Sequence, residues 1–186
     1  MNASRSRNSL VFWTAAVSVV VLDFITKKLV VAKLLEGVPS RIIGDVVRFR
    51  LAFNPGAAFS MSVGDKSRYF FGGLAVVALV VLWWLYRSTK SGDWVRVLAL
   101  GLAWGGAAGN LVDRLRGSRG VVDFIDIGVG NVRFWTFNVA DSAVTIGAIT
   151  LAFILWREDR EKLALAAGEA AMRDQPMRDQ SSPGAQ

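Results

Sequence analysis

The chain has 186 residues, of which 53% are hydrophobic and 20% charged, and its formal net charge is +7 at pH 7. It contains no cysteine and no histidine, which excludes disulfides, thiolate or imidazole metal sites, cysteine nucleophiles and histidine-dependent catalysis. Any catalysis must therefore use carboxylates, lysine, hydroxyl groups or the backbone.

The positive charge lies around the ends of apolar runs, where lysine and arginine side chains reach lipid headgroups. A basic soluble domain would suggest a nucleic-acid partner. Here we expect membrane lipids as partners and no nucleic acid.

Four apolar segments predict four transmembrane helices, at about residues 10–33, 69–87, 94–113 and 137–156. The second contains the uncharged run YFFGGLAVVALVVLWWLY, and a bilayer core about 30 Å thick needs about 20 helical residues. The first follows a basic stretch, as in a signal peptide, but no cleavage motif follows it. We therefore expect it to remain attached.

Two segments outside these helices, residues 40–62 and 120–135, predict β-structure. VVRFRLAFN alternates apolar and polar residues and ends at the turn-forming NPG, whereas GVVDFIDIGVGNVRFW predicts two short strands about a Gly/Asn turn. Asp123 and Asp126 in this hairpin are an odd number of positions apart, so only one of them can face the helices. The expected fold is an all-α integral membrane protein with four transmembrane helices and a small extracytoplasmic β-sheet.

The third apolar segment carries Gly101, Gly105 and Gly109 at four-residue spacing, which is typical of close helix packing in lipid. After the single membrane domain, residues 1–157, the chain becomes charged and repeats MRDQ. We expect residues 158–186 to be a charged cytoplasmic tail that begins as a helical extension and becomes disordered.

Polar residues from separate parts of the chain converge on one membrane face, because consecutive helices cross the bilayer in alternating directions. They are Asp23, Lys27, Asn54, Asn110, Asp113, Arg114, Asp123, Asn138 and Asp141. A lone buried polar residue is usually structural, but a set from separate segments indicates a functional site. The basic pair Arg5 and Arg7 favours a cytoplasmic N-terminus, which puts this set on the outer face.

Two carboxylates held close together can act as a hydrolytic pair, because one of them stays protonated while the other deprotonates water. Asp123 and Asp141 are candidates for such a pair. Asp23 and Lys27 could form an ion pair that lets the helix insert, or belong to the site. Arg114 could bind a carboxylate, a lipid phosphate or Asp113.

A serine/lysine hydrolase using Ser60, Ser62 and Lys66 is disfavoured, because a lysine in a polar loop is not activated as a base.

The blocks VLDFITK, FNPGAAFS, GGAAGNLVDRLRG with VVDF, and FNVADSA resemble the motif series of the lipoprotein signal peptidase (signal peptidase II) family, in the same order. The resemblance covers about residues 10–156. Members are four-helix aspartyl endopeptidases of the bacterial inner membrane. They remove signal peptides from diacylglyceryl-modified prolipoproteins, cutting N-terminal to the lipidated cysteine.

The resemblance implies that Asp123 and Asp141, and not Asp126, are catalytic. Residues that it assigns to substrate binding or support of the site are Asp23, Lys27, Asn54, Gly56, Ala57, Asn110, Asp113, Arg114, Arg116, Asn138 and Ala140. It implies prolipoprotein substrates. We expect no metal, no cofactor and a monomer. Both termini would be cytoplasmic and the active site would lie near the outer leaflet.

Two other functions remain as alternatives. In a small transporter or ion-conducting subunit, Asp23, Lys27, Asp123 and Asp141 would form an ion path, but these groups stop at one face and the second helix is uncharged. A noncatalytic assembly factor would bind lipids through the sheet, and Asp123→Asn would then be silent.

Overall fold

The computed structural model describes residues 3–56, 66–117 and 119–173. The chain divides into two compact units, with the boundary between Leu151 and Ala152. Four α-helices lie within the described residues: α1 Ala3–Lys33, α2 Ser67–Ser88, α3 Trp94–Arg116 and α4 Val139–Arg173. Each contains a stretch long and apolar enough to cross a membrane, which confirms the predicted fold class.

Helix α1 begins at Ala3, about two turns before the expected start of the first apolar segment. Asn8 explains part of this extension. Its side-chain amide is buried, donates to the carbonyl oxygen of Lys90 at 3.1 Å and accepts from the backbone N–H of Gly92 at 3.4 Å. The polar first turns of α1 are therefore attached to the connection between α2 and α3.

Helix α4 runs to Arg173, so residues 158–173 form a charged helical extension of the kind expected at the start of the tail. Arg157 and Glu161 form an ion pair at 3.2 Å, one turn apart, and the segment is rich in alanine and leucine. Such pairs and residues favour a helix even where few contacts surround it. The remainder of the expected tail, residues 174–186, lies outside the described residues.

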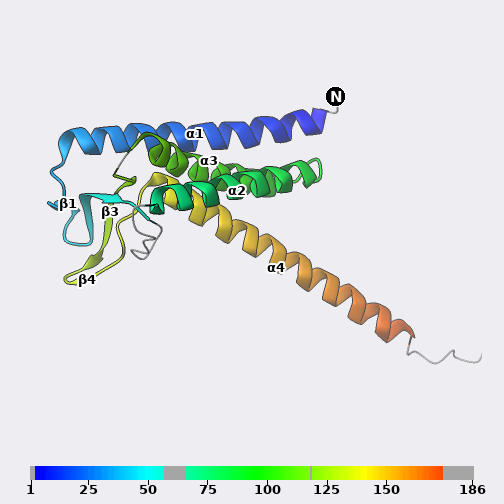
Figure 1. Cartoon of the computed structure of the whole chain (residues 1–186). Coiled ribbons are helices and arrows are strands. Elements are labelled where there is room, and N and C mark those ends of the chain that lie inside the picture. Colours follow the sequence, from blue (N-terminus) through cyan, green and yellow to red (C-terminus); the bar gives the residue numbers. More distant parts are fainter. Residues whose placement is uncertain (1–2, 57–65, 118, 174–186) are drawn as a thin grey trace, which may run out of the picture. The chain divides into compact units, whose positions relative to one another are not determined.

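A four-stranded antiparallel sheet lies near the end of α1 and the start of α4 (Figure 1). Its strands, in the order β1-β2-β3-β4, are β1 Ser40–Ile43, β2 Val47–Asn54, β3 Val121–Val129 and β4 Val132–Arg133. The register pairs Ala52 with Asp123. This pairing brings the end of β2 beside the start of β3. Residues 57–62 of the first predicted β-segment lie outside the described residues.

Helix α3 packs closely against α1 along the glycine stripe. A β-carbon built on Gly101 would lie 2.8 Å from the carbonyl oxygen of Phe12, and one on Gly105 would lie 2.7 Å from that of Ala16. A side chain on Gly106 would meet the backbone of Ala140 at the start of α4. Glycine therefore lets α3 approach both helices and brings the polar end of each into one region.

Candidate active site

Asn138 and Asp141 form a reciprocal cap at the start of α4. The backbone N–H of Asp141 donates to the side-chain oxygen of Asn138 at 2.9 Å, and the backbone N–H of Asn138 donates to Asp141 Oδ2 at 3.2 Å. This is the capping-box arrangement, which satisfies two N–H groups that have no partner inside the helix. The cap fixes the Asp141 carboxylate at the positive end of the helix dipole.

Asn138 also reaches the second carboxylate. Its side-chain nitrogen donates to Asp123 Oδ1 at 2.7 Å, and the residue is fully buried. The amide orientation is unambiguous, because its oxygen accepts from a backbone N–H and its nitrogen must therefore face Asp123. The Asn138 side chain therefore bonds both to the carboxylate of Asp123 and to the backbone N–H of Asp141.

Each carboxylate has a further amide donor. Asn54, at the end of β2, donates from Nδ2 to Asp123 Oδ2 at 3.1 Å. Asn110, in α3, donates from Nδ2 to Asp141 Oδ1 at 2.7 Å. The pair is therefore positioned by three asparagines from three elements.

Lys27 forms ion pairs and a hydrogen bond with polar groups that surround the aspartates. Its ammonium lies 2.7 Å from Asp23 Oδ2, 2.8 Å from Asp113 Oδ2 and 3.0 Å from Asn110 Oδ1, so all three of its protons have acceptors. Asp23 Oδ1 also accepts from the backbone N–H of Ala140 at 2.9 Å. The network therefore joins α1 and α3 to the first turn of α4.

Asp113 extends this network to the sheet, since its Oδ2 also accepts from the backbone N–H of Val122 at 3.1 Å. Val122 is the residue directly before Asp123. Neither Asp23, Lys27 nor Asp113 lines the pocket that contains the aspartates. The ion pair considered from the sequence is thus formed, and it supports the site without facing it.

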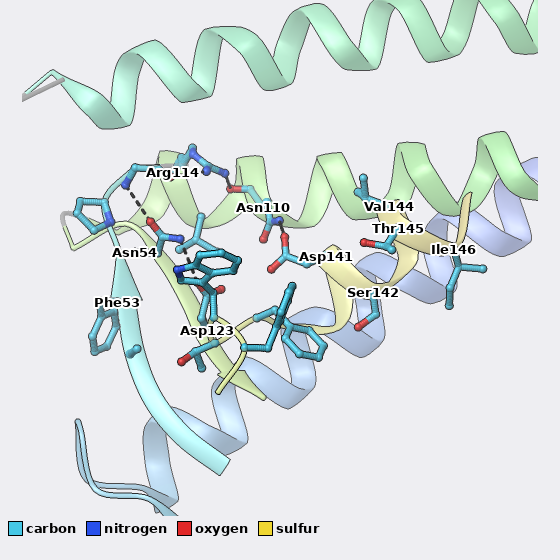
Figure 2. Close-up of a pocket in the computed structure, with 18 residues that line it drawn as sticks. Phe53, Asn54, Asn110, Arg114, Asp123, Asp141, Ser142, Val144, Thr145 and Ile146 are labelled. Atoms are coloured by element: carbon cyan, nitrogen blue, oxygen red, sulfur yellow. Dashed lines mark hydrogen bonds between the residues drawn. The ribbon is translucent and has the colours of Figure 1, made fainter. Parts of the chain in front are cut away.

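Asp123 and Asp141 project from β3 and α4 into one pocket of about 800 Å³ (Figure 2). Arg114 lines it as well, donating to the carbonyl oxygens of Asn110 at 3.1 Å and Gly56 at 3.0 Å. Gly56 in turn donates its N–H to Asn54 Oδ1 at 3.1 Å. The polar end of the pocket therefore combines two carboxylates, one guanidinium and amides.

The pKa of Asp123 differs from that of an ordinary aspartate. Burial, followed by the charge of Asp141, raises the pKa of Asp123 from its ordinary 3.8 to about 7, against the opposing effect of its hydrogen bonds from Asn54 and Asn138. Asp123 therefore carries a proton through the acidic range. Asp141 accepts from an amide and a backbone N–H.

The other wall of the pocket is apolar, and it was missed by sequence reasoning. It includes Phe134 and Trp135, which follow β4, and Val144 and Ile146 on α4. The aromatic cluster FWTF directly before the helix was the available signal, because exposed aromatic side chains beside a polar site are typical of ligand contact.

Arg116, assigned to the site from the sequence, and Asp126, which was not, both lie apart from the pocket. The guanidinium of Arg116 is 5.3 Å from the ring centre of Phe24 and does not line the pocket. Asp126 is buried but is 2.6 Å from Arg133 Nε. Ala57, Ser60 and Ser62 lie outside the described residues. Among the described residues, no group of three or more acidic side chains is close enough to hold a metal ion.

Comparisons with known proteins show which family the chain belongs to. Residues 15–157 match the family model described as Signal peptidase (SPase) II. The chain belongs to the signal peptidase II family. A relative from Rhodococcus jostii (strain RHA1), a lipoprotein signal peptidase, is 43% identical over 154 residues, which are 80% of this chain and 73% of the relative. A lipoprotein signal peptidase from Polynucleobacter necessarius subsp. necessarius (strain STIR1) is 36% identical, over 88% and 98% of the two chains.

A solved structure has a similar fold. A bacterial membrane enzyme determined by the in meso method at 2.3 Å resolution has a TM-score of 0.73 and is 28% identical, covering 84% of this chain and 92% of its own. The resemblance to signal peptidase II is therefore confirmed, as are the multi-pass membrane fold and the aspartic peptidase class. The individual roles of the site residues remain predictions.

Proposed function

We propose that this signal peptidase II removes signal peptides from diacylglyceryl-modified prolipoproteins, cleaving N-terminal to the lipidated cysteine, with Asp123 and Asp141 as its catalytic pair. The observation that carries the proposal is that both carboxylates enter one pocket while one buried residue, Asn138, donates to both, from its side-chain nitrogen to Asp123 and from its backbone N–H to Asp141. No cofactor is required, because two carboxylates can supply both the base and the acid of amide hydrolysis.

The two aspartates take different parts in this reaction. Asp141, as the carboxylate, accepts a proton from water while the water oxygen bonds to the scissile carbonyl carbon. Asp123, protonated, donates to the carbonyl oxygen and stabilises the charge that develops there. When the tetrahedral intermediate collapses, the C–N bond breaks and the amine leaves with the proton that Asp141 had taken. Asp123 recovers its own proton from the intermediate's hydroxyl, which restores the starting pair.

The substrate's lipid explains why Asp141 lies in the first turn of a membrane helix. A diacylglyceryl group held in the bilayer fixes the depth of the scissile bond, so the reacting carboxylates must lie at that depth. The apolar wall with Phe134, Trp135 and Ile146 offers a surface for such chains beside the aspartates. Attachment of the substrate's lipid to the bilayer would then place the scissile bond next to the two catalytic carboxylates.

The same proposal includes location and stoichiometry. Four spans put both termini on one side, and the basic residues Arg5 and Arg7 in the first turns of α1 favour the cytoplasm for that side. The site then lies near the outer leaflet of the bacterial inner membrane. The proposal also takes the protein to act as a monomer.

The test is cleavage of a diacylglyceryl-modified prolipoprotein and of its unlipidated form in lipid, by the native chain, Asp123→Asn and Asp141→Asn. We expect lipid-dependent cleavage by the native chain and a loss of about 10³-fold or more in each variant, because the pair acts as a unit. Asp126→Asn is the matched control, since it alters a carboxylate of the same strand outside the pocket.

Thermal unfolding of each variant must show a folded protein. Cleavage by both dyad variants at the native rate would rule out the two-aspartate mechanism. Equal cleavage of the unlipidated form would rule out the proposed role of the lipid.

A further inference from the structure

A second pocket lies at the other end of the bundle, between the start of α1 and the end of α2. It has a volume of about 610 Å³, and Arg5, Ser9 and Trp13 of α1 face Tyr86 and Arg87 of α2 across it. In Figure 1 the start of α1 and the turn after α2 lie together, away from the sheet. This groove shares no residue with the pocket of the aspartates.

The groove is positively charged. Two guanidinium groups from different helices line it, no acidic residue does, and both arginines are exposed. Within the described ranges, no carboxylate forms an ion pair with Arg5 or Arg87. The planar guanidinium group matches phosphate oxygens in a two-pronged hydrogen bond, so the pair favours a phosphate over a diffuse negative surface.

Aromatic side chains place the groove at a membrane boundary. Phe12 stacks on Tyr86 with ring centres 4.2 Å apart, and Trp13 lies 5.7 Å from Trp83. Tryptophan and tyrosine gather at membrane–water interfaces. Along α1, Arg5 and Asp23 are separated by a rise of about 27 Å, close to the thickness of a bilayer core. The groove and the aspartates therefore belong to opposite leaflets.

We propose that this groove binds the phosphate of an anionic membrane phospholipid, with an acyl chain along Leu10 and Trp13. Both side chains line the groove and are exposed, at 69% and 39%, so an apolar chain can cover them. That apolar side favours a lipid over free phosphate. The lack of a lining carboxylate favours an anionic headgroup, because nothing there would pair with the ammonium of a zwitterionic one.

Native mass spectrometry of the full chain in detergent, with equal amounts of phosphatidylglycerol and phosphatidylcholine, tests the proposal. We expect the native protein to retain one phosphatidylglycerol in preference. Retention should fall about 25-fold in Arg5→Gln/Arg87→Gln, since each of the two basic groups near a membrane surface contributes roughly a fivefold preference. Arg7→Gln/Lys90→Gln removes the same charge at the same end outside the groove and should retain the lipid.

Equal retention by the native protein and Arg5→Gln/Arg87→Gln, or an equal loss in Arg7→Gln/Lys90→Gln, would overturn the proposal. So would equal retention of phosphatidylcholine, or displacement of the lipid by inorganic phosphate at matched concentration. Ser9→Phe keeps the charge and fills the groove, so it should also reduce retention, and it decides the matter if the double variant does not fold. Prolipoprotein cleavage by Arg5→Gln/Arg87→Gln in detergent should be unchanged, which separates this proposal from the catalytic one.

Discussion

Asn138 makes hydrogen bonds to both aspartates of the candidate site. It is fully buried and caps α4. Its side-chain oxygen accepts from the backbone N–H of Asp141, and its side-chain nitrogen donates to Asp123. A buried asparagine is costly unless its groups are bonded, and here its side-chain oxygen and nitrogen both have partners. Its function is therefore to position the two carboxylates relative to each other.

We predict that Asn138→Ala loses about 10²-fold in kcat, because the carboxylates lose their shared support. It should also lower the free energy of unfolding by about 2 kcal/mol, through the lost cap and the unsatisfied groups left behind. Cleavage kinetics and thermal unfolding in detergent measure both effects. Ser142→Ala is the control, since that hydroxyl donates only to the Asn138 carbonyl oxygen at 3.0 Å, and it should change kcat less than threefold, about 0.6 kcal/mol.

The pH dependence of cleavage follows from Asp123. Its pKa of about 7 means that its proton is present below neutral pH and lost as the pH rises through that value. Because Asp123 must donate to the carbonyl oxygen, we predict that kcat/KM falls on the alkaline side with an apparent pKa near 7. A profile of kcat/KM against pH checks this, and a rate that stays flat from mildly acidic to strongly alkaline pH would contradict a shared proton.

At the scale of elements, the glycines of α3 determine how closely the helices meet. Gly105→Ala would press a methyl group against the backbone of Ala16, and backbone cannot rotate away. We predict a loss of about 1–3 kcal/mol in stability, with a fall in activity as α1 and its network shift. Thermal unfolding of Gly73→Ala provides the comparison, because no atom lies within 4 Å of the added carbon there. Equal melting temperatures for the two variants would show that close packing is unimportant.

Lys27 shows how elements far apart in sequence are held together by charge. It pairs with Asp23 of its own helix and Asp113 of α3, and those carboxylates accept N–H groups at the start of α4 and in β3. Breaking a buried pair leaves a charge without compensation, which is far more costly than losing a surface pair. The network therefore holds in place the start of α4 and strand β3, which carry Asp141 and Asp123.

At the scale of the whole molecule, orientation in the membrane can be measured directly because the chain has no cysteine. Ser40 in β1 and Ser91 between α2 and α3 are both exposed. We predict that an impermeant maleimide labels Ser40→Cys in intact cells, whereas Ser91→Cys is labelled only after lysis. The native chain is the blank, and the reverse pattern would invert the proposed orientation.

The sequence by itself determined the four spans, the strand pattern and the family, because apolar length, alternation and motif order are local properties that need no fold to be recognised. It also identified the polar residues that meet at one face. It did not choose between Asp123 and Asp126 without the family resemblance, since alternation says only that their side chains differ in direction.

Tertiary structure decided which partner each group has. Asp126 pairs with Arg133, Lys27 supports the site from behind, Arg116 lies over Phe24, and Phe134 and Trp135 complete the pocket. The sequence predicted a charged extension of α4 past residue 157 but not where it ends, because charged, alanine-rich sequence is compatible with both helix and disorder. Partners depend on three-dimensional distances between segments, and no local pattern encodes those distances.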